Sequence, residues 1–348
     1  MSLHSDASDN RLTRRRRVVL RADAGSRIGM GHFVRTCALA AYLADEFDCV
    51  VASRNPDLGH MTGHQLSMIA EANARPAPLT GGERDEFDRD FLDYIQKDDI
   101  VVLDNYYYPT LYQTETRGRC AALVCIDDVH DRHFTADAVL TFCPLSRADF
   151  SLEDYTLFRG GMEWAFLRKP FLAPVKKRVS KSSDSGPLRI ATAMGGADPF
   201  GLTDKIVSII IRLAPQARID VIAGSSVKAE CGSWPNVTVH READAATIAA
   251  IFDRADAGIF PASTVCVEAL SRMLPIIAGW YVDNQKEIYA DGVSRGWFAP
   301  IGNMLDDTDE IEMRLRRALG NLPTPPEMDF AVQCERIRDI FRNFRDRR

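Results

Sequence analysis

Short apolar runs that end in polar or glycine-rich turns recur along the first half of the chain. They cover residues 18–24, 49–53, 99–105, 122–128 and 138–142. Unbroken apolar runs of this kind are typical of parallel strands that are buried on both faces. Between them, residues 34–46, 64–73 and 87–96 carry apolar side chains at helical spacing. The alternation predicts an α/β fold built on a doubly wound parallel sheet.

The same pattern begins again in the second half of the chain. Its apolar runs cover 188–194, 218–224, 237–241, 257–262, 275–280 and 297–302, and helical segments separate them. Residues 176–187, between the two series, are polar and rich in serine. A segment of that composition predicts a linker.

Two series of strands and helices predict two domains. We expect Rossmann-like domains at 18–175 and 188–325 that face a central cleft, with the linker at 176–187 between them. Residues 326–348 are predicted to form a helix. The sequence leaves open whether this helix crosses back onto the first domain. A chain of 348 residues with 46% hydrophobic residues has enough apolar surface for two cores.

Charge and hydropathy narrow the range of partners. The formal net charge of −6 gives no general attraction to nucleic acid or to an anionic membrane. Residues 1–17 are polar, end in four arginines and lack apolar periodicity, so we expect a disordered basic tail. No apolar stretch approaches the ~20 residues of a membrane helix. We therefore expect no membrane insertion and a cytoplasmic protein, and we also expect a monomer.

The cysteines and aspartates give little support for a metal. The eight cysteines are scattered without a CxxC pair, which predicts reduced, mainly buried thiols. Asp127 and Asp128 follow a predicted strand, where carboxylates can hold a metal, but no HxE, DxD or EF-hand spacing accompanies them. We expect neither a metal nor a cofactor.

Ligands in open α/β sheets bind outside the carboxyl ends of the strands, so the turns that follow the strands are candidate sites. The first such turn carries Gly29 and Gly31, which allow close approach of a ligand to the backbone at a helix N-terminus. Val34 stands where the dinucleotide fingerprint needs a third glycine, and the Walker GK[ST] pattern is absent. The turn is therefore no standard nucleotide loop.

His32 and Arg35 follow these glycines and leave alternatives open. His32 is either a packed or surface histidine or a general base, since the pKa of an ordinary imidazole is close to 6.5. Arg35 lies on roughly the same helical face and either holds a phosphate or pairs with a carboxylate.

The second half offers two further turns of the same kind. Gly195 and Gly196 follow its first strand and either approach a ligand or only form a tight turn. Ser263 and Thr264 can cap a helix and present its amides and their hydroxyls to a diphosphate. Glu268 lies one turn further and is either a ligand contact or a solvated side chain.

Polar side chains follow two more strands. Asn284 and Gln285 can donate to sugar hydroxyls or acyl groups, or only cap the next helix. Asp104, Asn105 and Tyr106 follow a strand of the first domain and complete the candidate set.

Taken together, these motifs resemble the PseG family, the UDP-sugar hydrolases of pseudaminic acid biosynthesis, which share the two-domain GT-B fold of the glycosyltransferase MurG. The likeness covers roughly residues 18–302, and the motifs occur in the order of the family. They are RADAGSRIGMGHFVRTCALA (21–40), LDNYY, CIDD, FRGGMEWAFLRKPF (158–171), MGGADPFGLT (194–203), STVCVEALSRMLPII (263–277) and DNQ.

The resemblance implies metal-independent hydrolysis of UDP-2,4-diacetamido-2,4,6-trideoxy-β-L-altropyranose to the free sugar and UDP, with inversion at the anomeric carbon. It implies His32 as the base and places the nucleotide against the second domain. The residues implied for the nucleotide are Gly195, Gly196, Ser263, Thr264 and Glu268. The residues expected near the sugar are Gly29, Gly31, Arg35, Asp104, Tyr106, Asn284 and Gln285.

One departure from the family pattern and two alternative functions remain open. Ala262 stands where the family usually has glycine before Ser-Thr, which bears on how closely the backbone approaches a phosphate. A GT-B glycosyltransferase would use the same UDP-sugar donor with an acceptor in place of water. A non-catalytic sugar-nucleotide-binding protein would bind in the same cleft without using His32 as a base.

Overall fold

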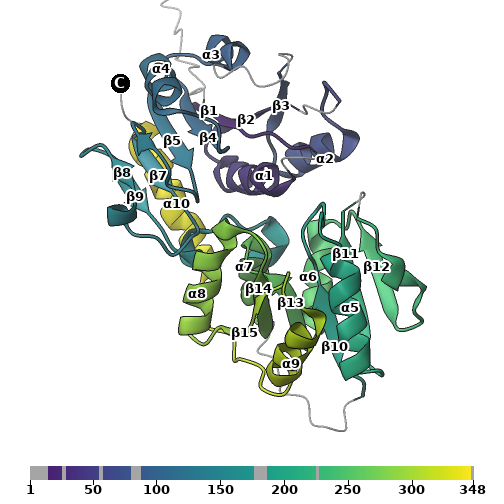
Figure 1. Ribbon diagram of the computed structural model, residues 1–348. Helices are drawn as coiled ribbons and strands as arrows, with labels where there is room; N and C mark the ends of the chain where they lie inside the picture. Colours follow the sequence, from purple (N-terminus) through teal and green to yellow (C-terminus); the bar gives the residue numbers. More distant parts are fainter. Residues whose placement is uncertain are drawn as a thin grey trace, which may run out of the picture.

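The computed structural model describes residues 15–25, 29–54, 58–79, 88–175, 186–224 and 227–345. Most of the expected basic tail and nearly all of the expected linker therefore lie outside the described residues. The described residues form two large parallel sheets, one from each half of the chain (Figure 1).

The first sheet has the strand order β3-β2-β1-β4-β5-β7-β9, and its paired strands are parallel. A separate parallel pair joins β6 to β8. The strands are β1 (Arg17–Arg21), β2 (Asp48–Ser53), β3 (Arg75–Pro78), β4 (Ile100–Leu103), β5 (Ala122–Ile126), β6 (His133–Phe134), β7 (Ala138–Leu140), β8 (Ser151–Leu152) and β9 (Leu157–Arg159). The helices are α1 (Gly31–Leu43), α2 (Gly63–Glu71), α3 (Arg89–Tyr94) and α4 (Thr110–Arg119), and the 3₁₀ turns are η1 (Arg147–Asp149), η2 (Met162–Trp164) and η3 (Lys169–Leu172).

The second sheet has the order β12-β11-β10-β13-β14-β15, again with parallel pairs. Its strands are β10 (Arg189–Thr192), β11 (Arg218–Ala223), β12 (Val237–Arg241), β13 (Ala257–Pro261), β14 (Ile276–Trp280) and β15 (Phe298–Asn303). The helices are α5 (Leu202–Leu213), α6 (Ala245–Arg254), α7 (Thr264–Ser271), α8 (Lys286–Ser294), α9 (Thr308–Leu319) and α10 (Phe330–Arg345), with the 3₁₀ turns η4 (Glu230–Ser233) and η5 (Asp283–Gln285).

Both sheets follow the Rossmann arrangement, in which the strand order reverses between two neighbouring strands. The reversal lies between β1 and β4 in the first sheet and between β10 and β13 in the second. Every residue of β4, β5, β7 and β13 is buried, as the unbroken apolar runs predicted. The prediction of a doubly wound α/β fold is confirmed. All eight cysteines are also buried and unpaired, as predicted.

Strand β3 was not predicted from the sequence, because its residues, Arg-Pro-Ala-Pro, do not form an apolar run. Proline cannot donate a ladder hydrogen bond, so it occurs in edge strands rather than in the middle of a sheet. β3 lies at the edge, paired only with β2 among the described strands. Strand β9, at the opposite edge, is three residues long and was too short to detect.

Helix α10 packs on the first sheet although it ends the chain (Figure 1). Its side chains Ile337, Phe341 and Phe344 belong to the same buried cluster as α1. Arg338 donates to the Tyr42 carbonyl at 2.7 Å, and Arg342 pairs with Glu46. The first residue of the helix, Phe330, instead belongs to a cluster with side chains of the second sheet. The helix therefore connects the two cores.

Segment 162–172 also packs against the second sheet. Phe171 lies 6.0 Å from Phe252 of α6, measured between ring centroids. Met162, Leu167 and Phe171 share one buried cluster with Phe252 and other residues of the second half. This packing fixes the position of Arg168, which follows Leu167.

We predict that Phe341→Ala destabilises the protein by about 3 to 5 kcal/mol, because a buried aromatic ring is lost and a cavity remains. The ring is fully buried and lies edge-on to Phe47, 6.4 Å away between centroids. Urea unfolding followed by far-UV circular dichroism measures the loss. Val332→Ala on the same helix is the matched control, because Val332 is 46% exposed, and should change stability by less than ~0.5 kcal/mol. Equal effects of the two substitutions would contradict the placement of α10.

Candidate active site

The candidate residues of the first domain lie where its strand order reverses. His32 and Arg35 belong to α1, which follows β1, and Asp104 directly follows β4. Strands β1 and β4 are paired neighbours. Because the carboxyl ends of parallel strands share one edge of a sheet, side chains far apart in sequence meet there.

His32 contacts Asp104 in the buried part of this edge. Helix α1 begins at Gly31, which places His32 in its first turn. Nδ1 of His32 lies 2.7 Å from Oδ1 of Asp104, and both side chains are buried. The structure therefore excludes a surface histidine and leaves a packed or a catalytic one.

Arg35 lies one helical turn after His32 and binds the same carboxylate. Its Nε donates to Oδ2 of Asp104 at 2.8 Å, and its Nη1 lies 3.2 Å from Oδ2 of Asp128. Thr36 also donates to Oδ2 of Asp104, at 3.0 Å. Of the two alternatives raised by the sequence, the carboxylate partner is the one observed in this structure.

These contacts keep Asp104 ionised. Burial alone would raise the pKa of Asp104, but the Arg35 guanidinium and His32 outweigh burial and lower the pKa to about 2. The two carboxylates near Arg35 likewise outweigh its desolvation and hold its pKa well above the usual value. At neutral pH the pair is a buried carboxylate and guanidinium.

The ionised carboxylate also selects the tautomer of His32. Nδ1 lies 2.7 Å from Asp104 and 3.0 Å from Nη2 of Arg35. A carboxylate only accepts, so a proton on Nδ1 that donates to Asp104 is the favoured arrangement. With its proton directed at Asp104, Nδ1 has no lone pair for Arg35, so the approach of Nη2 is then a contact and not a hydrogen bond. No hydrogen bond to Nε2 is seen among the described residues. Nε2 therefore carries the lone pair that can accept a proton.

Tyr106 connects this cluster to the second domain. Its ring stands edge-on to His32 with 4.4 Å between centroids, and its hydroxyl accepts from Nδ2 of Asn284 at 3.4 Å. Burial and the nearby Asp128 raise the pKa of Tyr106, so the hydroxyl stays protonated. The loops after β4 and β14 therefore meet. Asn284 is exposed, whereas Gln285 is buried and accepts from the Tyr281 backbone N–H at 2.9 Å.

Two buried polar side chains beside this cluster are incompletely satisfied. Neither side-chain atom of Asn105 has a hydrogen-bond partner within the described structure, and neither does Oδ1 of Asp128. Unsatisfied buried polar atoms are uncommon because each one costs desolvation energy. Asn105 and Oδ1 of Asp128 therefore have hydrogen-bonding capacity available for a ligand.

The glycines of the first turn have different roles. Gly29 has φ +77°, a conformation that favours glycine, and its N–H donates to the Gly25 carbonyl at 2.8 Å. Residues 26–28 of the turn lie outside the described part of the chain. Gly31 opens α1 without a positive φ, and an added Cβ would meet no described atom within 4 Å at either glycine, so only Gly29 is required by its backbone conformation.

The corresponding turn of the second domain follows β10. Gly195 has φ +95°, as the tight-turn interpretation requires. Its neighbour Gly196 packs its carbonyl so closely on Gly224 that a Cβ there would lie 2.0 Å from the oxygen. The turn is thus held close to the end of β11.

Helix α7 follows β13, at the reversal point of the second sheet. Ser263 occupies the N-cap position, but its side chain makes no capping hydrogen bond, contrary to the capping prediction. Its hydroxyl instead donates to the Pro261 carbonyl at 3.4 Å. Thr264 is the first helical residue, and the first turn contains no acidic side chain. This helix end is therefore able to attract an anion.

Glu268 of α7 forms a bidentate ion pair with Arg168. The two hydrogen bonds measure 2.8 and 2.9 Å, and both side chains are largely buried. The solvated glutamate considered from the sequence is therefore not what the structure shows. Arg168 itself was not singled out, although it lies within the FRGGMEWAFLRKPF motif, because nothing in the sequence indicates which carboxylate it reaches.

The described residues show neither a metal-binding cluster nor a membrane helix. No group of three or more His, Cys, Asp or Glu side chains within them could hold a metal ion. Asp127 accepts from the N–H groups of Val129 and His130, and Asp128 faces Arg35. None of the described helices is long and apolar enough to cross a membrane.

The sequence comparisons give one distant relative. No protein-family model matches the chain. It is 21% identical over 295 residues to an uncharacterized protein of Methanocaldococcus jannaschii, in an alignment that covers 79% of this chain. The chain spans 58% of the length of that relative.

Solved structures give a closer likeness in fold. MnaA of S. aureus, solved with UDP, matches with a TM-score of 0.60 and 10% identity, over 94% of this chain and 96% of its own. MurG of Acinetobacter baumannii matches with a TM-score of 0.57 and 14% identity, over 94% of this chain and 99% of its own. The kitacinnamycin glycosyltransferase matches with a TM-score of 0.54 and 15% identity, over 95% of this chain and 96% of its own. The chain therefore has the GT-B fold of two Rossmann-like domains, as predicted.

Proposed function

We propose that the protein hydrolyses a UDP-linked deoxy acylamino hexose to the free sugar and UDP, in nonulosonic acid biosynthesis of the pseudaminic type. The observation that carries this proposal is the contact between Nδ1 of His32 and ionised Asp104 at the reversal point of the first sheet, and in the proposed reaction Nε2 is the atom that accepts a proton. The PseG-like motifs supply the substrate and the stereochemical course.

The proposed reaction needs one base and one stabilised leaving group. Nε2 of His32 takes a proton from water as the water oxygen bonds to the anomeric carbon. The bond from that carbon to the β-phosphate oxygen breaks, its electron pair leaves with UDP, and the configuration inverts. Asp104 stabilises the imidazolium, and Arg35 with Thr36 fixes the carboxylate. A general base of this kind contributes about 10²- to 10⁴-fold to the rate.

The second domain supplies the proposed nucleotide site. The amides that open α7, with Ser263 and Thr264, face the diphosphate and stabilise its charge as it leaves. Gly195 and Gly196 allow the nucleotide to approach the backbone. Glu268 accepts from the ribose hydroxyls with the lone pairs that Arg168 leaves available.

The sugar is proposed to lie between the two domains. Tyr106 and Asn284 already contact each other across the gap and offer a hydroxyl and an amide. Gly29, Gly31 and the Arg35–Asp104 pair are proposed to lie near the sugar on the side of the first domain, and Gln285 holds the loop that carries Asn284. The Asn105 amide, which has no partner among the described residues, adds a donor and an acceptor that suit an acylamino group.

Glycosyl transfer is the second candidate function, because the chain shares its fold with proteins named as glycosyltransferases. In that case His32 would deprotonate an acceptor hydroxyl in place of water. The two functions therefore differ in whether UDP is released without an acceptor.

We predict that His32→Ala lowers acceptor-independent UDP release by about 10²- to 10⁴-fold, because the base is removed. The purified protein is incubated with UDP-2,4-diacetamido-2,4,6-trideoxy-β-L-altropyranose, and NMR follows both UDP and the anomeric configuration of the sugar. His64→Ala is the control, since His64 is an exposed histidine of the same domain. Release by wild-type protein only after an acceptor is added would favour transfer. UDP binding without release under either condition would favour a non-catalytic binding protein.

We further predict that Arg168→Met weakens UDP binding about tenfold, or about 1.4 kcal/mol. The substitution keeps much of the side-chain volume but frees Glu268 from its bidentate partner, so the carboxylate no longer holds one orientation for the ribose. Isothermal titration calorimetry measures the dissociation constant. Arg212→Met, which breaks the exposed pair with Glu312, is the matched control. Tighter binding by Arg168→Met would instead mean that Arg168 competes with the ribose.

A further inference from the structure

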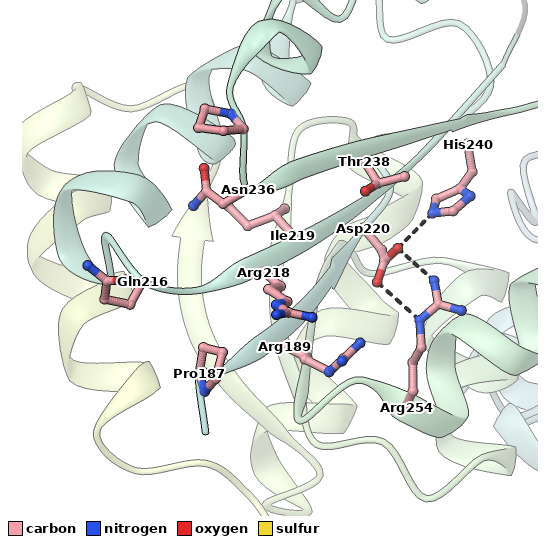
Figure 2. Close-up of a pocket in the computed structure, with 11 residues that line it drawn as sticks. Pro187, Arg189, Gln216, Arg218, Ile219, Asp220, Asn236, Thr238, His240 and Arg254 are labelled. Atoms are coloured by element: carbon pink, nitrogen blue, oxygen red, sulfur yellow. Dashed lines mark hydrogen bonds and ion pairs between the residues drawn. The ribbon is translucent and has the colours of Figure 1, made fainter. Parts of the chain in front are cut away.

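A polar hollow lies on the second domain, away from the candidate active site. It has a volume of about 760 Å³, and its lining includes Arg189, Arg218, Asp220, His240 and Arg254 (Figure 2). Arg189 and Arg218 begin β10 and β11. The hollow is therefore at the amino ends of these parallel strands, whereas the proposed nucleotide site follows their carboxyl ends.

Strand register places the polar side chains of the hollow on one face of the sheet. Arg189 is paired with Arg218, and Asp220 with Thr238. Alternate residues of a strand point to the same face, so Asp220 shares a face with Arg218, and His240 shares one with Thr238. The opposite face of β11 carries Ile219 and Val221, which pack in the hydrophobic core. Three adjacent strands therefore present one polar face to the hollow.

The lining carries an excess of positive charge. Among the described lining residues, three arginines face a single carboxylate, Asp220, which already accepts from His240 at 2.7 Å and from Arg254 at 2.7 Å. Burial alone would raise the pKa of Asp220, but hydrogen bonds from Arg254 and His240 outweigh it and lower the pKa. The ionised carboxylate thus fixes two of the basic groups and has little capacity to neutralise the others.

Arg189 and Arg218 lack a comparable partner. Within the described part of the chain, neither guanidinium makes a side-chain hydrogen bond or ion pair. Arg189 contacts Asp256 through its backbone, whose N–H donates to Oδ2 at 2.8 Å and whose carbonyl accepts from the Asp256 N–H at 2.7 Å. The two residues stand in register on neighbouring strands, where like charges repel each other. An anion between them would remove this repulsion and bind both guanidinium groups, each of which matches phosphate oxygens bidentately.

The size and lining of the hollow define the ligand class. A volume of about 760 Å³ falls in the range of small-molecule sites, roughly 300 to 1,000 Å³. His240 is the only aromatic side chain among the described residues that line it, so stacking of a nucleobase has little support. The amide side chains of Gln216 and Asn236 can bond hydroxyl groups, and Nδ2 of Asn236 is fixed by the Ala217 carbonyl at 2.7 Å.

We infer that this hollow is a second ligand site, separate from the proposed active site, and that it binds a small phosphate ester such as a sugar phosphate through Arg189, Arg218 and Arg254. The inference does not depend on the proposed function, because it uses neither His32 nor the residues of the nucleotide site. A phosphorylated metabolite bound here would occupy the second domain while the carboxyl ends of its strands remain accessible.

Isothermal titration calorimetry of the full chain with inorganic pyrophosphate and with inorganic phosphate tests the site. We expect wild-type protein to bind pyrophosphate and the double variant Arg189→Ala/Arg218→Ala to bind it at least tenfold more weakly at this site. The control variant Arg295→Ala/Arg316→Ala removes two partly exposed arginines of the same domain and should stay within twofold of wild type. Equal affinity of the two double variants, or no binding by wild type, overturns the inference.

Two further measurements distinguish this site from the nucleotide site and from a lipid-binding surface. Pyrophosphate is titrated again with excess UDP, and binding that is lost in its presence overturns a separate site. The protein is also mixed with phosphatidylglycerol vesicles. If it binds the vesicles only when both arginines are present, and binds neither pyrophosphate nor phosphate, the hollow is a lipid-binding surface and the inference of a small-molecule ligand is overturned. Should the double variant fail to fold by circular dichroism, the single exposed substitution Arg218→Gln is used. It must weaken pyrophosphate binding at least threefold for the inference to stand.

Discussion

The buried pair of Arg35 and Asp104 ties helix α1 to the end of β4, and the candidate active site is arranged around it. A buried carboxylate without a partner is strongly unfavourable, and removal of one member of such a pair typically costs about 3 to 5 kcal/mol. The same contacts that satisfy the two charges also hold His32 with Nδ1 toward Asp104. The contacts that orient His32 as a base are therefore the same contacts that stabilise the first domain.

The connection between the domains rests on a few contacts of different kinds. Helix α10 and segment 162–172 provide apolar packing that links the two cores. The Arg168–Glu268 pair adds a charged link beside α7, and Tyr106 with Asn284 adds a polar one between the loops. Segment 162–172 packs beside α7, and α10 packs on α1 and β4, so the apolar links and the polar links adjoin the same strand reversals.

The two ends of the second sheet differ in how their polar groups are used. At the carboxyl ends lie the first backbone amides of α7 and the paired Glu268, the groups that we propose for the nucleotide. At the amino ends, positive side chains are concentrated on one face, and one carboxylate is shared between His240 and Arg254. In both places the fold positions charge through strand register or helix direction, so small ligands rather than large surfaces fit the arrangement.

The sequence by itself determined the two α/β domains, because buried parallel strands leave unbroken apolar runs that alternate with helical periodicity. It also indicated the strand-end turns, since glycine and polar residues there depend on local chemistry. It missed β3, whose prolines suit only a sheet edge. The tertiary structure alone decided that Arg35 pairs with Asp104, that Glu268 pairs with Arg168, and that Arg189 stands beside Arg218. Each of these contacts joins residues far apart in the chain, and no local pattern specifies which partner a long charged side chain will reach.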